Sequence, residues 1–475
     1  MWYYNQPDGV VYIDNMLYGY KGEMPQGTSI VVNEGTLGIL GSAFSNCFGL
    51  TSIEIPNSVT SIESNAFYGC ISLKSVTIPN SATRIGNYAF FNCDSLACIE
   101  IPNTVISIGE WAFCECDSLT SIDIPNSVTS IGYGAFANCY NLINIKLPEN
   151  ITNLGPLFLH GTMWYNNQPD GVVYIGNALY GYKGEMPQGT SIVVNEGTLV
   201  IAGGAFGTCS GLASIEIPNS VTKIGDEAFI GCSSLTSIEI PNSVTSIGNN
   251  AFEACSGLTS IEIPNSVTSI ESYAFYGCIS LKSVTIPNSA TRIGNYAFFN
   301  CDSLACIEIP NSVTSIGHGA FGDCSSLTSV TIGNSVTNIG EYAFSRCSSL
   351  KNVYISSETP PAAKYSFFEN DYNAITLYVP HGALAAYKAT EEWGKFANIV
   401  EFDPTGIEAT EEDAPAFEVT SNGIQFTASE GKAIAVYTIG GALIESTDSY
   451  AGEEITLEKG VYVVKIGNKI IKVKL

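Results

Sequence analysis

Basic residues are scarce in this chain. Its 475 residues include 19 lysines and arginines against 45 aspartates and glutamates, a formal net charge of -26. Such a charge repels phosphate backbones and anionic lipid headgroups, so we expect neither nucleic acid nor a membrane surface as a partner. No apolar run approaches the roughly 20 residues of a membrane-spanning helix, and no signal or transit peptide follows Met1.

Histidine is scarcer still, with three residues at His160, His318 and His381. A Ser-His-Asp triad or a Cys-His dyad needs a histidine beside a nucleophile and an acid, and the spacing of the residues indicates no such arrangement. The sequence also lacks H-E-x-x-H, C-x-x-C and a glycine-rich phosphate loop. It therefore predicts a protein that is not an enzyme, with no catalytic residue, no metal ligands and no cofactor.

A repeat of 23 residues dominates what is present. It is marked by an Ala-Phe pair whose phenylalanines are Phe44, Phe67, Phe90, Phe113, Phe136, Phe206, Phe229, Phe252, Phe275, Phe298, Phe321 and Phe344. A typical unit, residues 244–266, reads VTSIGNNAFEACSGLTSIEIPNS. Its L-x-x-I-x-I stretch alternates like a strand and ends at Pro-Asn, whereas A-F-x-x-C suits one helical or 3₁₀ turn.

One such coil cannot bury its own apolar side, but a stack of coils can. The repeat therefore predicts a β-rich solenoid of 23-residue coils, with a parallel sheet on one side and short helical or 3₁₀ turns on the other. Residues 1–44 and 155–206 fit as divergent coils, in which Phe158 and Leu179 take the place of the Ala-Phe phenylalanine.

Two blocks of the sequence are duplicated. Residues 2–44 recur almost unchanged as 164–206, so Met1 matches the internal Met163, and we expect the natural polypeptide to begin upstream, with any export signal there. Residues 63–103 and 271–311 differ only at Asn65 and Tyr273. Duplication of whole blocks favours a protein that displays a binding surface or acts as a spacer over one with a unique active site.

Fifteen cysteines would suggest disulfides in an exported protein. Twelve of them, however, follow the Ala-Phe phenylalanine by three residues, at Cys47, Cys70, Cys93, Cys116, Cys139, Cys209, Cys232, Cys255, Cys278, Cys301, Cys324 and Cys347. This spacing predicts a file of small buried thiols with parallel side chains. Of the rest, Cys98 and Cys306 occupy an outward strand position and are expected to be exposed.

The candidate ligand-binding face is the outward side of the sheet. Between the two inward isoleucines of the coil stand Glu54, Glu100, Asp123, Glu216, Glu239, Glu262 and Glu308. They predict either a solvated face or an acidic groove for a basic protein segment or a divalent cation. A second patch could form from aromatic residues near the Ala-Phe pair, unless these only pack between turns: Tyr68, Phe91, Trp111, Tyr273, Tyr276, Tyr296 and Phe299.

The repeat L-x-x-I-x-I-P-x-x-V-x-x-I-G-x-x-A-F-x-x-C resembles that of the BspA-like leucine-rich-repeat surface proteins, over about residues 1–400. The resemblance implies a leucine-rich-repeat solenoid over residues 1–402, closed by a C-terminal cap at 350–402 with a degenerate coil at Phe367. It also implies a secreted or cell-surface protein linked to adhesion to host proteins, other cells or matrix. No catalytic residue comes with it.

The C-terminal part differs from the repeats. Residues 403–415 are acidic and aperiodic, which indicates a linker, and residues 416–475 alternate like a small antiparallel β-sandwich. GVYVVK at 460–465, followed by Lys472 and Val473, is similar to the sorting domain of type IX secretion and implies an export and anchoring role. We therefore expect a monomer that binds an extracellular protein or glycan; the alternatives are a structural spacer or stalk, or a glycan-binding accessory protein.

Overall fold

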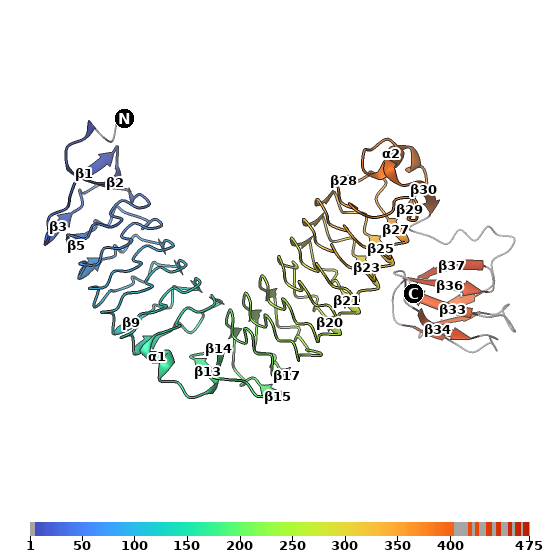
Figure 1. Cartoon of the computed structure of the whole chain (residues 1–475), viewed down its shortest axis with the longest axis horizontal. Coiled ribbons are helices and arrows are strands. Elements are labelled where there is room, and N and C mark those ends of the chain that lie inside the picture. The colour runs from blue at the N-terminus through green and yellow to red at the C-terminus, as the bar shows by residue number, and fades with distance from the viewer. Residues whose placement is uncertain are drawn as a thin grey trace. The chain divides into compact units, whose positions relative to one another are not determined.

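The computed structural model describes residues 5–402 and, beyond them, seven strands with Leu457. Its contacts divide the chain into two units, one of Met1–Ser234 with Pro241–Glu253, the other of Leu235–Ile240 with Ala254–Leu475. In each unit the chain winds into stacked coils (Figure 1). The coils carry two sets of parallel strands, here called the front ladder (the L-x-x-I-x-I strands) and the rear ladder (two-residue strands at the S-I of V-T-S-I-G).

The first unit contains two interrupted ladders. The front ladder comprises β3 (Thr28–Val31), β5 (Leu50–Glu54), β6 (Ser75–Thr77), β9 (Ser121–Asp123), β11 (Asn144–Lys146), β15 (Thr190–Val193) and β17 (Leu212–Glu216). The rear ladder comprises β4 (Gly38–Ile39), β7 (Arg84–Ile85), β8 (Ser107–Ile108), β10 (Ser130–Ile131), β12 (Asn153–Leu154), β16 (Val200–Ile201), β18 (Lys223–Ile224) and β19 (Ser246–Ile247). Neighbouring strands are parallel and mostly in step with the 23-residue repeat, as in Ile122 opposite Ile145.

The second unit continues the same pattern. Its front ladder comprises β20 (Ser260–Glu262), β21 (Ser283–Thr285), β23 (Cys306–Ile309), β25 (Ser329–Ile332), β27 (Asn352–Ile355), β29 (Thr376–Pro380) and β30 (Asn398–Phe402). Its rear ladder comprises β22 (Arg292–Ile293), β24 (Ser315–Ile316), β26 (Asn338–Ile339) and β28 (Ala362–Ala363). The predicted solenoid with parallel sheets is confirmed.

The Ala-Phe segments form a third set of coil-to-coil hydrogen bonds, here called the turn ladder. In one coil the amides of Asn65, Phe67 and Gly69 donate to carbonyls of the next coil at 2.9, 2.8 and 2.7 Å. Cys70 N–H bonds back to Phe67 C=O at 3.2 Å, as in a 3₁₀ turn. Asn65 and Gly69, however, have φ of 60° and 70°, so the turn cannot continue. The predicted helical or 3₁₀ turns are therefore single turns between left-handed residues.

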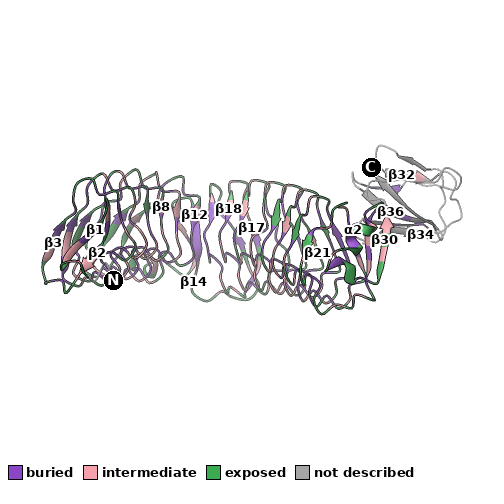
Figure 2. Cartoon of the chain, turned by 90° about the horizontal axis from the view of Figure 1, so that it is seen from above, coloured by how far each residue is buried: buried purple, intermediate pink, exposed green. Residues whose placement is uncertain are grey.

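The Ala-Phe phenylalanines form the centre of the core, which is buried in both units (Figure 2). From Phe44 to Phe136 the rings stack with centroids 5.1–5.4 Å apart. From Phe275 to Phe367 the spacing is 5.1–5.3 Å. The 23-residue period places each ring directly on the next, because the backbone rises by about one strand spacing per coil.

Every cysteine, all of them within residues 5–402, is a thiol outside any disulfide. In the predicted file the Sγ atoms donate to the phenylalanine carbonyl of the preceding coil, as from Cys70 to Phe44 at 3.1 Å. Ten members are buried, but Cys47 and Cys209 are half-buried, which corrects the prediction for them. Cys98 is exposed as predicted, whereas Cys306 is half-buried and its pKa is raised, chiefly by burial.

The divergent stretch at 155–206 departs from its prediction. After α1 (Met163–Asn166) it contains an antiparallel hairpin of β13 (Gly171–Ile175) and β14 (Ala178–Lys183). Leu179 lies opposite Ile201 on the rear ladder, so it does not replace the Ala-Phe phenylalanine. Phe158 takes the position of the alanine in the Ala-Phe pair. Its carbonyl accepts from Phe136 N–H, just as the Ala135 carbonyl accepts from the phenylalanine N–H of the preceding coil. The hairpin of β1 (Gly9–Ile13) and β2 (Met16–Lys21) repeats this arrangement.

The last coils close the core of the second unit. Helix α2 (Leu384–Lys388) and the 3₁₀ helix η2 (Trp393–Lys395) bring Tyr387 and Trp393, both buried, against the stack. The Trp393 ring meets the Phe367 ring edge-on at 5.5 Å. Phe367 N–H, which has no further coil to reach, donates to Glu392 Oε1 at 3.3 Å. The side chain of Glu392 thus supplies the hydrogen-bond acceptor that a further coil would otherwise provide.

The described strands beyond Phe402 pair antiparallel. They are β31 (Phe417–Val419), β32 (Gly423–Phe426), β33 (Ile434–Thr438), β34 (Leu443–Thr447), β35 (Ile455–Thr456), β36 (Val461–Ile466) and β37 (Lys469–Lys474). Their orders are β31-β32-β35 and β34-β33-β36-β37. Val436 and Val464 are fully buried. The predicted linker at 403–415 lies outside the described residues.

Candidate functional site

The seven predicted acids, here called the front acids, all have exposed side chains. Five lie on strands of the front ladder, whereas Glu100 and Glu239 hold the same repeat position in coils whose front segment is not a strand. Each follows a buried isoleucine, such as Ile53 before Glu54 and Ile261 before Glu262, because successive strand residues point to opposite faces. Glu54, Glu100, Asp123 and Glu216 belong to the first unit, and Glu239, Glu262 and Glu308 to the second. Each unit therefore carries its own part of the acidic face.

Neutral residues and one lysine interrupt the acidic face. Glu54 lies between Val31 and Thr77, and Glu262 lies opposite Thr285. Asp123 lies opposite Lys146, with Oδ1 3.8 Å from Nζ and both side chains about three-quarters exposed at 74% and 77%. Such an exposed pair is only weakly stabilising, but the lysine neutralises the local negative charge of Asp123.

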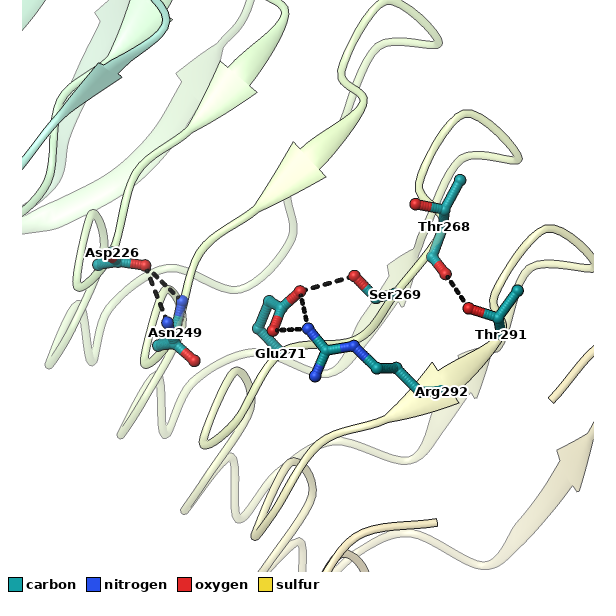
Figure 3. A network of polar contacts seen from close by, with 7 residues as sticks. All are labelled: Asp226, Asn249, Thr268, Ser269, Glu271, Thr291 and Arg292. Atoms are coloured by element: carbon teal, nitrogen blue, oxygen red, sulfur yellow. Dashed lines mark hydrogen bonds and ion pairs between the residues drawn. The ribbon is translucent and has the colours of Figure 1, made fainter. Parts of the chain in front are cut away.

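Two acids that follow the rear positions of their coils form contacts within the solenoid, as Figure 3 shows. In the second unit, Glu271 accepts from Ser269 Oγ at 2.6 Å and from Arg292 Nη2 at 2.5 and 2.7 Å. In the first unit, Asp226 accepts from Asn249 N–H at 2.7 Å. By contrast, within the described residues no basic side chain lies within ion-pair distance of five of the front acids: Glu54, Glu100, Glu216, Glu239 and Glu262.

The structure does not bring the three histidines together. His160 packs near Tyr165, His318 lies in a row of aromatic rings, and His381 Nδ1 is 3.7 Å from Glu401. Among the described residues no group of three or more His, Cys, Asp or Glu side chains is placed to hold a metal ion. No helix in the same part of the chain is long and apolar enough to cross a bilayer.

The predicted aromatic patch forms several short stacks. Tyr68 stacks on Phe91 at 4.9 Å, Tyr276 on Phe299 at 5.4 Å, and Tyr273 on Tyr296 at 5.0 Å. Trp111 meets the Tyr133 ring at 5.0 Å, tilted by 43°. Ring faces stacked along the coils cover one another, so a sugar cannot lie flat on them. This geometry favours packing between turns over a glycan platform.

Sequence reasoning missed a groove of about 420 Å³ on β9 and β11, with Trp164 at its side. Two signals in the sequence mark the place. Lys146 stands where most other coils carry an acid or threonine, and the 23-residue spacing stops after Phe136. Neither signal indicated that a strand edge would be left open, because the residues that follow were assigned to further coils.

Comparison with known families identifies the repeat. The model described as "BspA type leucine rich repeat region (6 copies)" matches residues 38–162, 175–305 and 268–382. A comparison with curated protein sequences found no significant match.

Several solved structures are similar in part. A leucine-rich repeat protein from Bacteroides ovatus is 28% identical, covering 77% of this chain and 94% of that one, with a TM-score of 0.35. A leucine rich cell surface protein from Faecalibacterium prausnitzii is 27% identical, with coverages of 86% and 96% and a TM-score of 0.28. The pneumococcal vaccine antigen PcpA is 20% identical, with coverages of 82% and 92% and a TM-score of 0.29. Because these scores are low, the assignment depends on the repeat model, which spans well over half of the sequence. The chain belongs to the BspA-type leucine-rich-repeat family.

Proposed function

We propose that this chain is a non-enzymatic, secreted or cell-surface repeat protein whose front ladder binds basic segments of host proteins, other cells or matrix. The observation that carries the proposal is the exposure of seven acids at one position of the repeat. Five of them have no basic partner among the described residues, in contrast to Glu271, which follows the rear position of its coil. Their field is therefore available to a partner.

The C-terminal strands would serve export. The antiparallel order β34-β33-β36-β37 suits one half of a β-sandwich, and β31-β32-β35 would form the other. Together with the resemblance of residues 460–465 to a type IX sorting domain, this supports an anchoring role for residues 416–475. Binding would then be left to the solenoid, which we expect to act as a monomer.

Salt and charge together test the acidic face. A binding screen of the purified chain against extracellular-matrix proteins and glycans comes first. Binding to a basic partner should weaken as salt rises, because the Debye length falls from about 10 Å at 0.1 M to about 3 Å at 1 M. Changing Glu216, Glu239, Glu262 and Glu308 together to glutamine should weaken binding at low salt in the same way.

A matched control keeps the net charge equal. The exposed acids Glu34, Glu110, Glu149 and Glu196 lie off the front strands, and their change to glutamine alters the total charge by the same amount. If both quadruple variants bind like the parent at low salt, the front acids are a solvated face. The duplicated block at 63–103 and 271–311 would then favour the spacer function.

A further inference from the structure

Strand β11 has an open edge in the middle of the first unit. Of the described strands, only β9 pairs with it, and the next front strand, β15, pairs with β17. Between them the chain turns into α1, whose Trp164 N–H donates to Leu142 C=O at 2.8 Å, just before β11. The position beside β11 at which the repeat would place another parallel strand is therefore not occupied by β15.

The rear of the coil remains joined at this point. Gly203 N–H donates to Leu154 C=O at 2.8 Å, and Lys223 Nζ donates to Asn153 Oδ1 at 2.9 Å. A Cβ on Gly203 would lie 2.5 Å from the Pro156 ring, so this contact is close. These contacts thus join the coils at the rear, although β12 pairs only with β10 among the described strands, whereas at the front β11 has no partner strand on its far side.

The backbone of β11 is suited to one more strand. Asn144 N–H donates to Thr120 C=O at 3.3 Å, and Lys146 C=O accepts from Ile124 N–H at 3.1 Å. These groups are directed towards β9. Because residues alternate between the two sides of a parallel strand, the N–H and C=O of Ile145 are directed towards the open edge.

The side chains around the edge indicate which peptide would fit. Ile143 is 43% exposed. Ile145 is half-buried, whereas its neighbour on β9, Ile122, is only 4% exposed. The aliphatic side chains at this edge are therefore partly accessible to solvent. Trp164 lies beside them at the groove. Lys146 is 77% exposed and stands at the acid position of the repeat, so an added strand would place its own outward residue beside an ammonium group.

We propose that the open edge of β11 binds an extended peptide as an additional parallel strand, with an acidic residue beside Lys146 and aliphatic residues against Ile145 and Trp164. Main-chain hydrogen bonds would give affinity, and alternate side chains would give selectivity. This site goes beyond the acidic face, since its ligand carries the opposite charge. The peptide that matches it has the alternation of the repeat strand itself.

Two N-methylated peptides test the backbone pairing without altering the protein. The probe is fluorescein-GLTSIEIPN-amide, the sequence of residues 257–265, titrated with the full chain by fluorescence anisotropy. In the register of β9 and β11 its glutamate amide would donate to Ile145 C=O. Methylating that amide should weaken binding about tenfold or more, whereas methylating the preceding isoleucine amide should leave it unchanged. Equal behaviour of the two peptides, or no binding of the parent peptide, would overturn the proposal.

A charge exchange tests the side-chain part. Lys146→Glu should weaken binding of the probe about tenfold, and a peptide with lysine in place of glutamate should recover it. Lys351→Glu is the matched control, because this exposed lysine precedes β27, which is paired on both sides. If Lys351→Glu weakens binding as much as Lys146→Glu, recognition of net charge replaces the proposed site. The glutamine variant of the four front acids should bind the probe like the parent, so failure of the acidic face and failure of this site are distinguishable.

Discussion

Replacing Glu392 tests how the solenoid is closed. Its side chain is 2% exposed, and it accepts from Phe367 N–H at 3.3 Å, Tyr372 Oη at 3.0 Å and Lys395 Nζ at 2.6 Å. Glu392→Ala leaves the buried amide of Phe367 and the half-buried hydroxyl of Tyr372 without their acceptor. Since each orphaned group costs about 1–3 kcal/mol, we expect a loss of about 2–5 kcal/mol. Glu392→Gln keeps an acceptor and should lose about 1–2 kcal/mol.

Lys395→Met separates the ion pair from the hydrogen bonds. The Lys395 side chain is 38% exposed, so water can replace much of its interaction, and its loss should cost about 1 kcal/mol or less. Hydrogen exchange of the segment around Phe367, followed by mass spectrometry, measures the opening of the cap locally. Unchanged exchange in Glu392→Ala would refute the role of this carboxylate.

The pH dependence has a defined sign. Burial raises the pKa of Glu392, but hydrogen bonds from Lys395, Phe367 N–H and Tyr372 outweigh it, and the pKa lies below its ordinary 4.5. A carboxyl with a lowered folded pKa stabilises the fold at pH above its unfolded pKa and loses this contribution as pH falls through the folded one. Protection of the cap in the parent should therefore decline below about pH 4.5, and Glu392→Gln should show less of this decline.

Three further predictions concern the coils. Phe298→Ala should cost about 3–5 kcal/mol, because it empties a buried stack, with increased exchange in the adjacent coils; a mutant that unfolds like the parent would contradict the ring stack. Gly294→Ala should cost about 1–3 kcal/mol, because the new Cβ would lie 2.5 Å from Ser272 N; unchanged urea unfolding would contradict this close approach. In the native state Cys98 should be alkylated faster than the buried thiols, and all fifteen cysteines should react after unfolding without reductant; disulfides found by mass spectrometry would reject this expectation.

The sequence predicted the regular coils because strand, turn and phenylalanine recur with one period. It did not predict left-handed residues such as Tyr296 and Glu227, with φ of 54° and 59°, because neither side chain signals that conformation. Leu179 was misplaced because an apolar residue in a hairpin can satisfy the repeat pattern while its register belongs to the rear ladder. The acid positions were predictable from strand alternation, whereas the open edge of β11 depends on where the chain places the hairpin of β13 and β14, which the repeat pattern does not indicate.

The hydrogen bonds of the turn ladder give each unit a net dipole along its stack of coils. Its amides all donate towards the following coil and its carbonyls accept from the preceding one, so the peptide dipoles add along the stack instead of cancelling. One end of such a stack presents partial negative charge from carbonyls, and the other presents partial positive charge from amides. The carboxylate of Glu392 at the amide end matches that polarity. Because the two ends carry partial charges of opposite sign, electrostatics favour adding a coil with its carbonyls facing the free amides of the stack. This preference does not depend on the side chains.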